Sequence, residues 1–278
     1  MSLFISSLNS GSNGNCYYVG NNNEAVLVDV GISCREVEKR MKKLGLSLNR
    51  VKAIFISHEH TDHISGVQVL AKKYELPVYI TPPVLRNSGL TLPPNLVRSF
   101  LPDQPVEIGE LKITAFEKEH DAVDPYSFIV AGNGVKVGVL TDIGVACKRV
   151  IHYFKQCHAV FLESNYDEHM LQTGGYPLHL KRRIKGGKGH LSNTEALQLF
   201  LAHRSPFMSH LLLSHLSKNN NHPDIVNDLF SAHANGIQVI VASRNQETPV
   251  FEINGTSNKS EVKTYAAPLK PVQLGLFG

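Results

Sequence analysis

Short apolar runs alternate with amphipathic segments along the chain, which is typical of a mixed α/β fold. Near the N-terminus the apolar runs are separated by Ser, Gly and Asn residues that favour turns, and this predicts a meander of strands. Similar runs continue through most of the sequence. The predicted strands cover residues 3–5, 16–19, 25–28, 53–56, 111–116, 126–130, 135–140, 160–162, 211–213, 238–241 and 250–253.

Helices are predicted between these strands. Ser33 with Glu36 three residues later is typical of a helix start, and Gly45 is typical of a helix end. The same capping-box spacing recurs at Ser192 and Glu195. The predicted helices run from Ser33 to about Leu44, from about Ile64 to Tyr74, from Ser192 to about Ala202 and from about Asp224 to Ala234.

The domain count does not follow from length alone. At about 150 residues per domain, 278 residues suggest two domains, but one large α/β unit reaches the same size. After Asn254 the sequence turns polar and loses its periodicity. We therefore expect one folded domain over residues 1–254 and a flexible tail over residues 255–278.

The composition, 42% hydrophobic and 19% charged, is that of an ordinary globular protein. Its 28 Lys and Arg residues against 24 Asp and Glu residues give a formal charge of +4, which excludes the strongly polybasic and strongly acidic classes. The four cysteines form no C-x-x-C pair, and the sequence shows neither a secretory leader nor about 18 consecutive apolar residues. We expect a cytoplasmic protein with free thiols.

Three of the 14 histidines fall within six residues, directly after a predicted strand, in the sequence His-Glu-His-Thr-Asp-His. Alternate residues of an extended chain project to the same side, so His58 and His60 can converge on one ion. The turn into the next helix then directs Asp62 and His63 toward a second ion. Without an ion or hydrogen bonds, so many polar groups at a strand end would be costly.

Further candidate ligands follow later strands, where loop residues can build a site over a rigid sheet. They are His120, Asp142 and His215. Two ions about 3.5–4 Å apart would need such a split ligand set and a bridging carboxylate. We interpret isolated histidines, such as His152 and His203, as surface or structural residues.

With these residues in this order, the chain resembles the metallo-β-lactamase-fold hydrolase superfamily over residues 3–253. The resemblance implies a four-layer αββα sandwich with a dimetal site on one edge. It also implies that Asp29 is a buried residue supporting the site. The implied ligands are His58, His60 and His120 for one ion, Asp62, His63 and His215 for the other, and Asp142 as the bridge.

Such a metal pair predicts hydrolysis, because it supplies hydroxide near neutral pH and stabilises charge on the attacking and leaving oxygens. Asp62 is also a candidate catalytic base for the attacking water. Imidazole ligands suit Zn²⁺, whereas the two carboxylates also suit Mn²⁺. The expected cofactor is therefore two divalent ions, Zn²⁺ or Mn²⁺.

Residues 189–193 and 212–217 are similar to paired motifs of the tRNase Z-like phosphodiesterases. In that branch a histidine and a glutamate together protonate the leaving oxygen, and the matching catalytic candidates here are His190 and Glu163. Residues 219–221 are three asparagines where tRNase Z proteins carry an Arg-Tyr pair. That departure argues against tRNA 3′ processing.

The chain resembles the YycJ/WalJ-type exonuclease group more closely, which implies degradation of DNA from 5′ ends. The match rests on residues 10–15, 163–167, 189–193 and 219–221. The loop at 10–15 would offer backbone N–H groups to a phosphate. The candidate substrate-binding residues in these segments are Ser12, Asn15, Asn165, Asn220 and Asn221.

Basic residues concentrate just before His190. Lys181, Arg182 and Arg183 begin a run to Lys188 that contains no acidic residue. A charge run is usually a solvated face, but here it would neutralise substrate phosphates and make binding salt-dependent. We therefore add these three residues to the candidate substrate-binding set.

The C-terminal end resembles the short peptide by which bacterial replication and repair proteins dock on the sliding clamp. The matching residues are Gln273, Leu274, Leu276 and Phe277. Leu and Phe would fill an apolar pocket, and a flexible linker would hold the enzyme near DNA at high effective concentration.

The leading hypothesis is a cytoplasmic, dimetal-dependent phosphodiesterase that degrades DNA in the 5′-to-3′ direction during repair or replication, recruited by the sliding clamp. One alternative keeps the chemistry and changes the substrate, to RNA or to a small phosphodiester. A second alternative, from another class, is a clamp-bound adaptor whose hydrolase site is vestigial.

Overall fold

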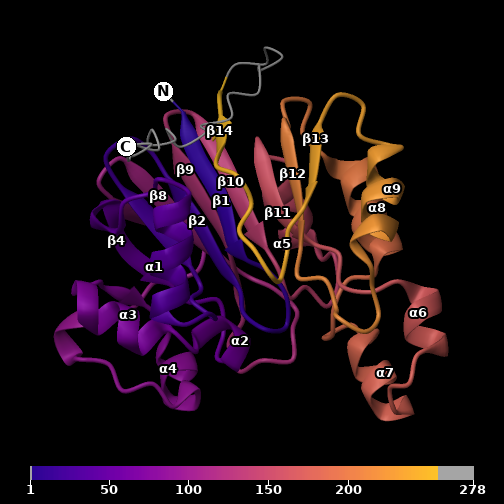
Figure 1. The fold of residues 1–278 in the computed structure, drawn as a ribbon, viewed down its shortest axis with the longest axis horizontal. Coiled ribbons are helices and arrows are strands. Elements are labelled where there is room, and N and C mark those ends of the chain that lie inside the picture. The colour runs from indigo at the N-terminus through magenta and orange to yellow at the C-terminus, as the bar shows by residue number, and fades with distance from the viewer. Residues whose placement is uncertain (1, 256–278) are drawn as a thin grey trace, which may run out of the picture.

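The computed structural model describes residues 2–255, and there two seven-stranded sheets pack face to face between outer helices (Figure 1). This is the predicted four-layer αββα order, which is therefore confirmed. Within the described part of the chain, no helix has the length and apolar character needed to cross a membrane. Of the predicted tail at 255–278, residues 256–278 lie outside the described residues, and with them the candidate clamp peptide at 273–277.

The first sheet is antiparallel from β14 to β3 and parallel from β3 to β6. Helices α1 (Cys34–Lys43), α3 (Val67–Tyr74) and α4 (Pro82–Ser88) cover its outer face and share a core with it. In spatial order its strands are β14 (Phe251–Ile253), β1 (Leu3–Asn9), β2 (Cys16–Gly20), β3 (Ala25–Val28), β4 (Val51–Phe55), β5 (Val78–Tyr79) and β6 (Val97–Arg98).

The second sheet is parallel from β13 to β10 and antiparallel from β10 to β7. Helices α5 (Lys148–Phe154), α8 (Asn193–His203) and α9 (Pro223–Ser231) cover its outer face. In spatial order its strands are β13 (Gln238–Val241), β12 (His210–Ser214), β11 (Ala159–Glu163), β10 (Val135–Leu140), β9 (Tyr126–Gly132), β8 (Leu111–Glu117) and β7 (Pro105–Ile108).

The central strands are apolar on both faces because each face is covered. In β11, Ala159 and Phe161 belong to the core between the sheets, whereas Val160 and Leu162 belong to the core under the helices. Alternation of a strand places these two pairs on opposite faces. This double burial explains why the parallel strands are continuous apolar runs in the sequence.

All eleven predicted strands are present, and the predicted start of α1 is confirmed because the Ser33 side chain accepts a hydrogen bond from Glu36 N. The continuous helix predicted over 64–74 is wrong. The chain forms α2 (Thr61–Ile64) and then α3, with a break at Gly66. A Cβ on Gly66 would lie 1.9 Å from the Ile32 carbonyl oxygen, so a contact with a distant loop sets the break.

The parallel strands position the site, because their carboxyl ends meet along one edge of the sandwich. Asp29, His58, Asp142, Glu163 and His215 lie at or just after the ends of β3, β4, β10, β11 and β12. Between β11 and α8 the chain also forms α6 (Glu168–Thr173) and α7 (Leu178–Ile184), below α8 and α9 in Figure 1.

Candidate metal and catalytic site

Asp29 holds the turn that carries the histidine cluster. Its fully buried carboxylate accepts hydrogen bonds from the backbone N–H and the hydroxyl of Ser57, each at 2.8 Å. It also lies 2.7 Å from Nδ1 of His63. The contact of Nδ1 with Asp29 fixes the orientation of the ring, so that Nε2 of His63 faces the other predicted ligands, 3.1 Å from Asp142 Oδ2.

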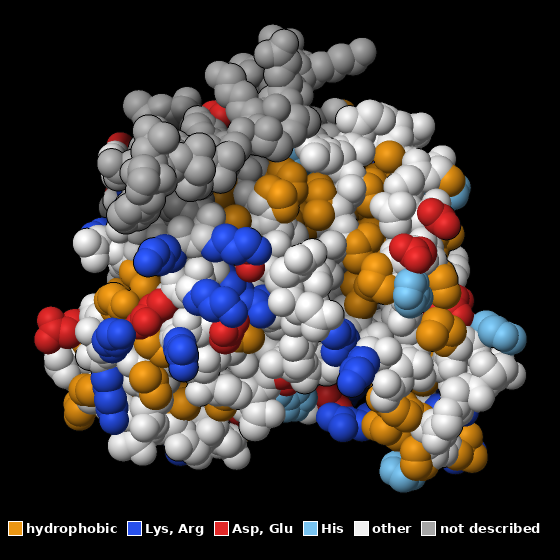
Figure 2. All heavy atoms as spheres, viewed as in Figure 1, with side chains coloured by type: hydrophobic (Ala, Val, Ile, Leu, Met, Phe, Trp, Pro, Cys, Tyr) orange, Lys and Arg blue, Asp and Glu red, His pale blue; other side chains and the backbone are white. Residues whose placement is uncertain are grey.

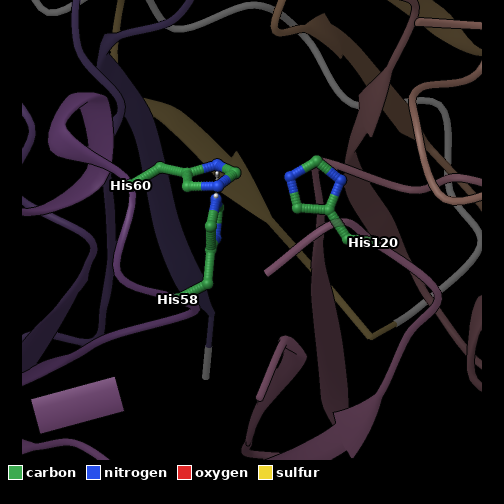
Figure 3. Close-up of side chains that lie close together, drawn as sticks. All are labelled: His58, His60 and His120. Atoms are coloured by element: carbon green, nitrogen blue, oxygen red, sulfur yellow. Dashed lines mark hydrogen bonds between the residues drawn. The ribbon is translucent and has the colours of Figure 1, made fainter. Parts of the chain in front are cut away.

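The first predicted ligand set converges. Ring nitrogens of His58, His60 and His120 lie within 4.8 Å of one another, and Figure 3 shows His120 facing the other two across a gap. Nδ1 of His120 donates to the carbonyl oxygen of Gly189 at 3.0 Å. Its Nε2 is buried and has no hydrogen-bond partner among residues 2–255.

The second predicted set also converges, because donor atoms of Asp62, His63 and His215 lie within 4.8 Å of one another. Asp142 lies between the two sets. Its carboxylate oxygens are 3.1 Å from His63 Nε2, 3.5 Å from His215 Nε2 and 3.8 Å from His120 Nε2. Oδ2 of Asp142 is buried and accepts no hydrogen bond from the described residues.

The pKa values of the histidines shift in opposite directions, because burial opposes a charge on each ring and nearby carboxylates favour it. Burial lowers the pKa of His120 to about 4, so this imidazole is neutral, as a ligand must be. Burial also opposes a charge on His215, but Asp142 and the hydrogen bonds to Asp62 and Glu163 raise the pKa of His215 to about 10. The carboxylates around His215 therefore favour a cation beside them.

The residues present fit a pair of divalent ions. Buried polar atoms without partners are rare in proteins, and of the six such side-chain atoms among residues 2–255, two belong to the predicted ligands His120 and Asp142. Imidazole and carboxylate donors suit Zn²⁺, and the carboxylates also suit Mn²⁺. The identity of the ions and the role of each ligand stay predictions.

Glu163 and His190, the predicted catalytic pair, are in contact. Oε1 of Glu163 accepts hydrogen bonds from Nδ1 of His190 at 2.7 Å and from Nδ1 of His215 at 3.0 Å. Burial works against ionisation of this carboxyl group, but the two histidines lower its pKa to about 2. Glu163 is fully buried, so it positions the two rings, whereas His190 reaches the cleft.

A cleft lies over the ligands. Figure 2 shows histidine and acidic side chains gathered at the lower centre of one face, beside Lys and Arg side chains. Of the predicted substrate-binding residues, Ser12, Asn165 and Arg183 line this cleft. Lys181 donates to the carbonyl oxygen of Gln172 at 2.7 Å instead, and Arg182 is exposed on α7 outside the cleft lining.

Three asparagines expected to bind substrate are buried and hydrogen-bonded inside the protein. Asn15 Nδ2 lies 3.2 Å from Asp62 Oδ2, and Asn221 Nδ2 donates to the carbonyl oxygen of Ser164 at 2.9 Å. The carbonyl oxygen of Asn220 accepts from the N–H of Asp167 at 2.8 Å. All three are buried in the chain as it stands, so their part in substrate binding stays a prediction.

Sequence reasoning missed one wall of the cleft. Tyr176 precedes α7, and Leu180 and Ile184 lie on one face of it, all lining the cleft. Arg183 pairs with Asp121, which also lies in the cleft. A signal for this wall is present in the sequence, because Leu180 and Ile184 are spaced four residues apart around the basic residues 181–183. Those basic residues were interpreted by their charge alone.

We expect the chain to bind two divalent ions, measurable by elemental analysis after dialysis. His58→Ala should retain fewer ions than the wild type, and Asp142→Ala fewer still, because Asp142 contacts both sets. His152→Ala, which removes an exposed histidine of α5, should retain both ions. A wild-type chain with less than one ion, or a His58→Ala chain with two, would contradict the assignment.

Comparison with known proteins agrees with this architecture. Residues 24–215 match the family described as Beta-lactamase superfamily domain. The chain is 34% identical to Exodeoxyribonuclease YycJ of Bacillus anthracis, over 95% of this chain and 98% of that protein. It is 31% identical to Exodeoxyribonuclease WalJ of Streptococcus pneumoniae, over 88% and 96%.

Among solved structures, the metallo-beta-lactamase fold protein YhfI of Bacillus subtilis superposes with a TM-score of 0.69 at 18% identity. The match covers 91% of this chain and 100% of YhfI. That similarity concerns the fold alone, whereas the two exodeoxyribonucleases match in sequence over nearly their whole length. The chain therefore belongs to the metallo-β-lactamase-fold hydrolase superfamily and, within it, to the group of the YycJ and WalJ proteins.

Proposed function

We propose that the chain is a metal-dependent DNA exonuclease that acts in the 5′-to-3′ direction in repair or replication. The observation that carries the proposal is the contact between Glu163 and His190 beside two converging ligand sets. A hydrolase that cleaves phosphodiesters needs both a site for attack and a proton donor for the leaving oxygen. The names of the YycJ and WalJ relatives support DNA as the substrate and exonuclease as the class.

Asp62 is suited to hold the attacking water. When bound, a divalent ion pair supplies Lewis acidity and an activated water near neutral pH. Burial disfavours ionisation of Asp62, but His63 and His215 lower its pKa to about 2, so its carboxylate is charged at neutral pH. A charged carboxylate in the cleft accepts a hydrogen bond from water and so sets the direction of attack.

His190 is suited to protonate the leaving oxygen. Glu163 accepts the Nδ1 proton, which fixes the ring orientation and stabilises the charged imidazolium. The other nitrogen, Nε2, makes no hydrogen bond to any of residues 2–255, and the ring lines the cleft. A proton on Nε2 is thus available to a substrate oxygen, and the same pair would serve an RNA or small phosphodiester substrate.

We also propose that residues 273–277 dock on the bacterial sliding clamp and that the protein is cytoplasmic. The first rests on the sequence Gln-Leu-Gly-Leu-Phe at 273–277. For the second, Cys16, Cys34, Cys147 and Cys157 are all free thiols, as is usual in a reducing compartment.

Purified protein with Mn²⁺ or Zn²⁺ should degrade end-labelled DNA, releasing a 5′ label early as mononucleotide while a 3′-labelled strand shortens stepwise. His58→Ala should be inactive. Early release of the 3′ label would show that the enzyme degrades DNA in the 3′-to-5′ direction instead. A preference for RNA, or turnover of small phosphodiesters independent of strand length, would favour the alternative substrates. If no DNA is cleaved, the proposal is wrong.

His190→Ala should lower kcat on DNA by about 10²–10⁴-fold, because a positioned proton donor contributes that much. A phosphodiester with a nitrophenolate leaving group needs no proton, so its turnover should fall far less. Metal content should match the wild type, and His152→Ala should behave as wild type on both substrates. Equal losses on the two substrates would contradict the role of His190 as general acid.

Deletion of residues 273–277 should abolish co-purification with the clamp and leave cleavage of short oligonucleotides intact. The deletion removes the docking peptide, which raises the effective concentration near DNA, and leaves the hydrolytic site unchanged. The measurement is a clamp pull-down beside a nuclease assay on the same preparations. A deleted chain that still binds the clamp would refute the assignment.

A further inference from the structure

The cleft wall formed by Tyr176 and α7 differs in chemistry from the metal ligands across from it. The ligands are imidazoles and carboxylates, whereas the wall presents the Tyr176 ring with the aliphatic side chains of Leu180 and Ile184. Leu180 and Ile184 are four residues apart and so share one face of the helix. An apolar, aromatic surface beside a hydrolytic centre suits the flat apolar part of a substrate.

We propose that Tyr176 stacks on the terminal base of a nucleic-acid strand whose scissile phosphate lies at the metal ligands. The inference rests on the proposed nuclease function and specifies how that site holds its substrate. Stacking on aromatic side chains is worth about 1–3 kcal/mol per base and tolerates any sequence, since every base has a π-face. An exonuclease must accept each base in turn, which stacking allows and base-specific hydrogen bonds do not.

The Tyr176 ring is held in place at its polar end. Its hydroxyl accepts a hydrogen bond from Nδ2 of Asn219 at 3.1 Å, while the half-buried ring lines the cleft. A tyrosine anchored by its hydroxyl loses little freedom when a base stacks on it, so more of the stacking energy contributes to binding.

The asparagine tract, residues 219–221, anchors the segment that carries Tyr176. The carbonyl oxygen of Asn220 accepts from the N–H of Asp167, which caps α6 by accepting from Met170 N at 2.8 Å. Asn221 joins the same tract to the end of β11 through the carbonyl oxygen of Ser164. The three consecutive asparagines at 219–221 therefore tie the wall to the strand ends.

Arg183 places a positive charge beside the same wall. Its guanidinium pairs with Asp121, and its side chain remains 59% exposed, so it is free to approach a phosphate. The cleft thus offers an aromatic face, a cation and the metal ligands along one surface. These are the groups that a strand end requires, a face for the base and positive charge for its phosphates.

The test compares kcat/KM on two oligonucleotides that differ only in the terminal residue, one with a base and one abasic. The wild type should prefer the substrate with the base. In Tyr176→Ala this preference should shrink by about 5- to 150-fold, the equivalent of 1–3 kcal/mol, mainly through KM. Tyr176→Phe keeps the ring and should retain the preference.

Tyr74→Ala is the matched control, because Tyr74 is a half-buried tyrosine of α3 whose hydroxyl bonds Glu38 at 3.0 Å outside the cleft lining. It should keep the wild-type preference. The stacking role is overturned if kcat/KM of Tyr176→Ala falls equally on both substrates. It is also overturned if Tyr176→Phe loses as much of the base preference as Tyr176→Ala. Wild-type protein that cleaves neither substrate overturns the nuclease function, whereas cleavage of both without a base preference overturns only the stacking.

Discussion

The buried carboxylate of Asp142 is the group on which the site depends. It is 1% exposed and lies within 4 Å of imidazoles from both ligand sets, so it joins the two halves of the cluster electrostatically. A buried charge costs several kcal/mol unless compensated, and here His215 and His63 hold the pKa of Asp142 well below its usual range despite burial. The sandwich therefore has to bring histidines from separate strands to one point.

Backbone conformation at the strand ends allows this convergence. Asp29, Asp142 and His215 each have a left-handed φ, between 56° and 59°, within two residues of the ends of β3, β10 and β12. Such a residue turns the chain sharply so that its side chain projects over the sheet edge. A non-glycine residue in this region costs about 1–3 kcal/mol, and at His215 the hydrogen bond from its N–H to Ser10 Oγ at 2.7 Å helps to hold the turn.

Periodicity predicted the strands because both of their faces are covered, and the order of polar residues at strand ends predicted which of them meet. What the sequence did not reveal depends on contacts between distant segments. The break at Gly66 follows from the approach of Ile32, and β5 and β6 are only two residues long. For the candidate site, the sequence shows three consecutive asparagines at 219–221. The local pattern does not distinguish an amide that faces substrate from one that satisfies a buried carbonyl.

The two parts of the site are built from different segments, yet they are coupled. The predicted metal ligands depend on Asp29 and the strand ends, whereas the cleft wall belongs to the segment between β11 and α8. That segment also contains Gly189, whose carbonyl oxygen orients His120, and its Arg183 pairs with Asp121 beside that same histidine. The cleft wall and the predicted ligand His120 are thus held by the same segment, so the position of the wall and the orientation of that imidazole depend on each other.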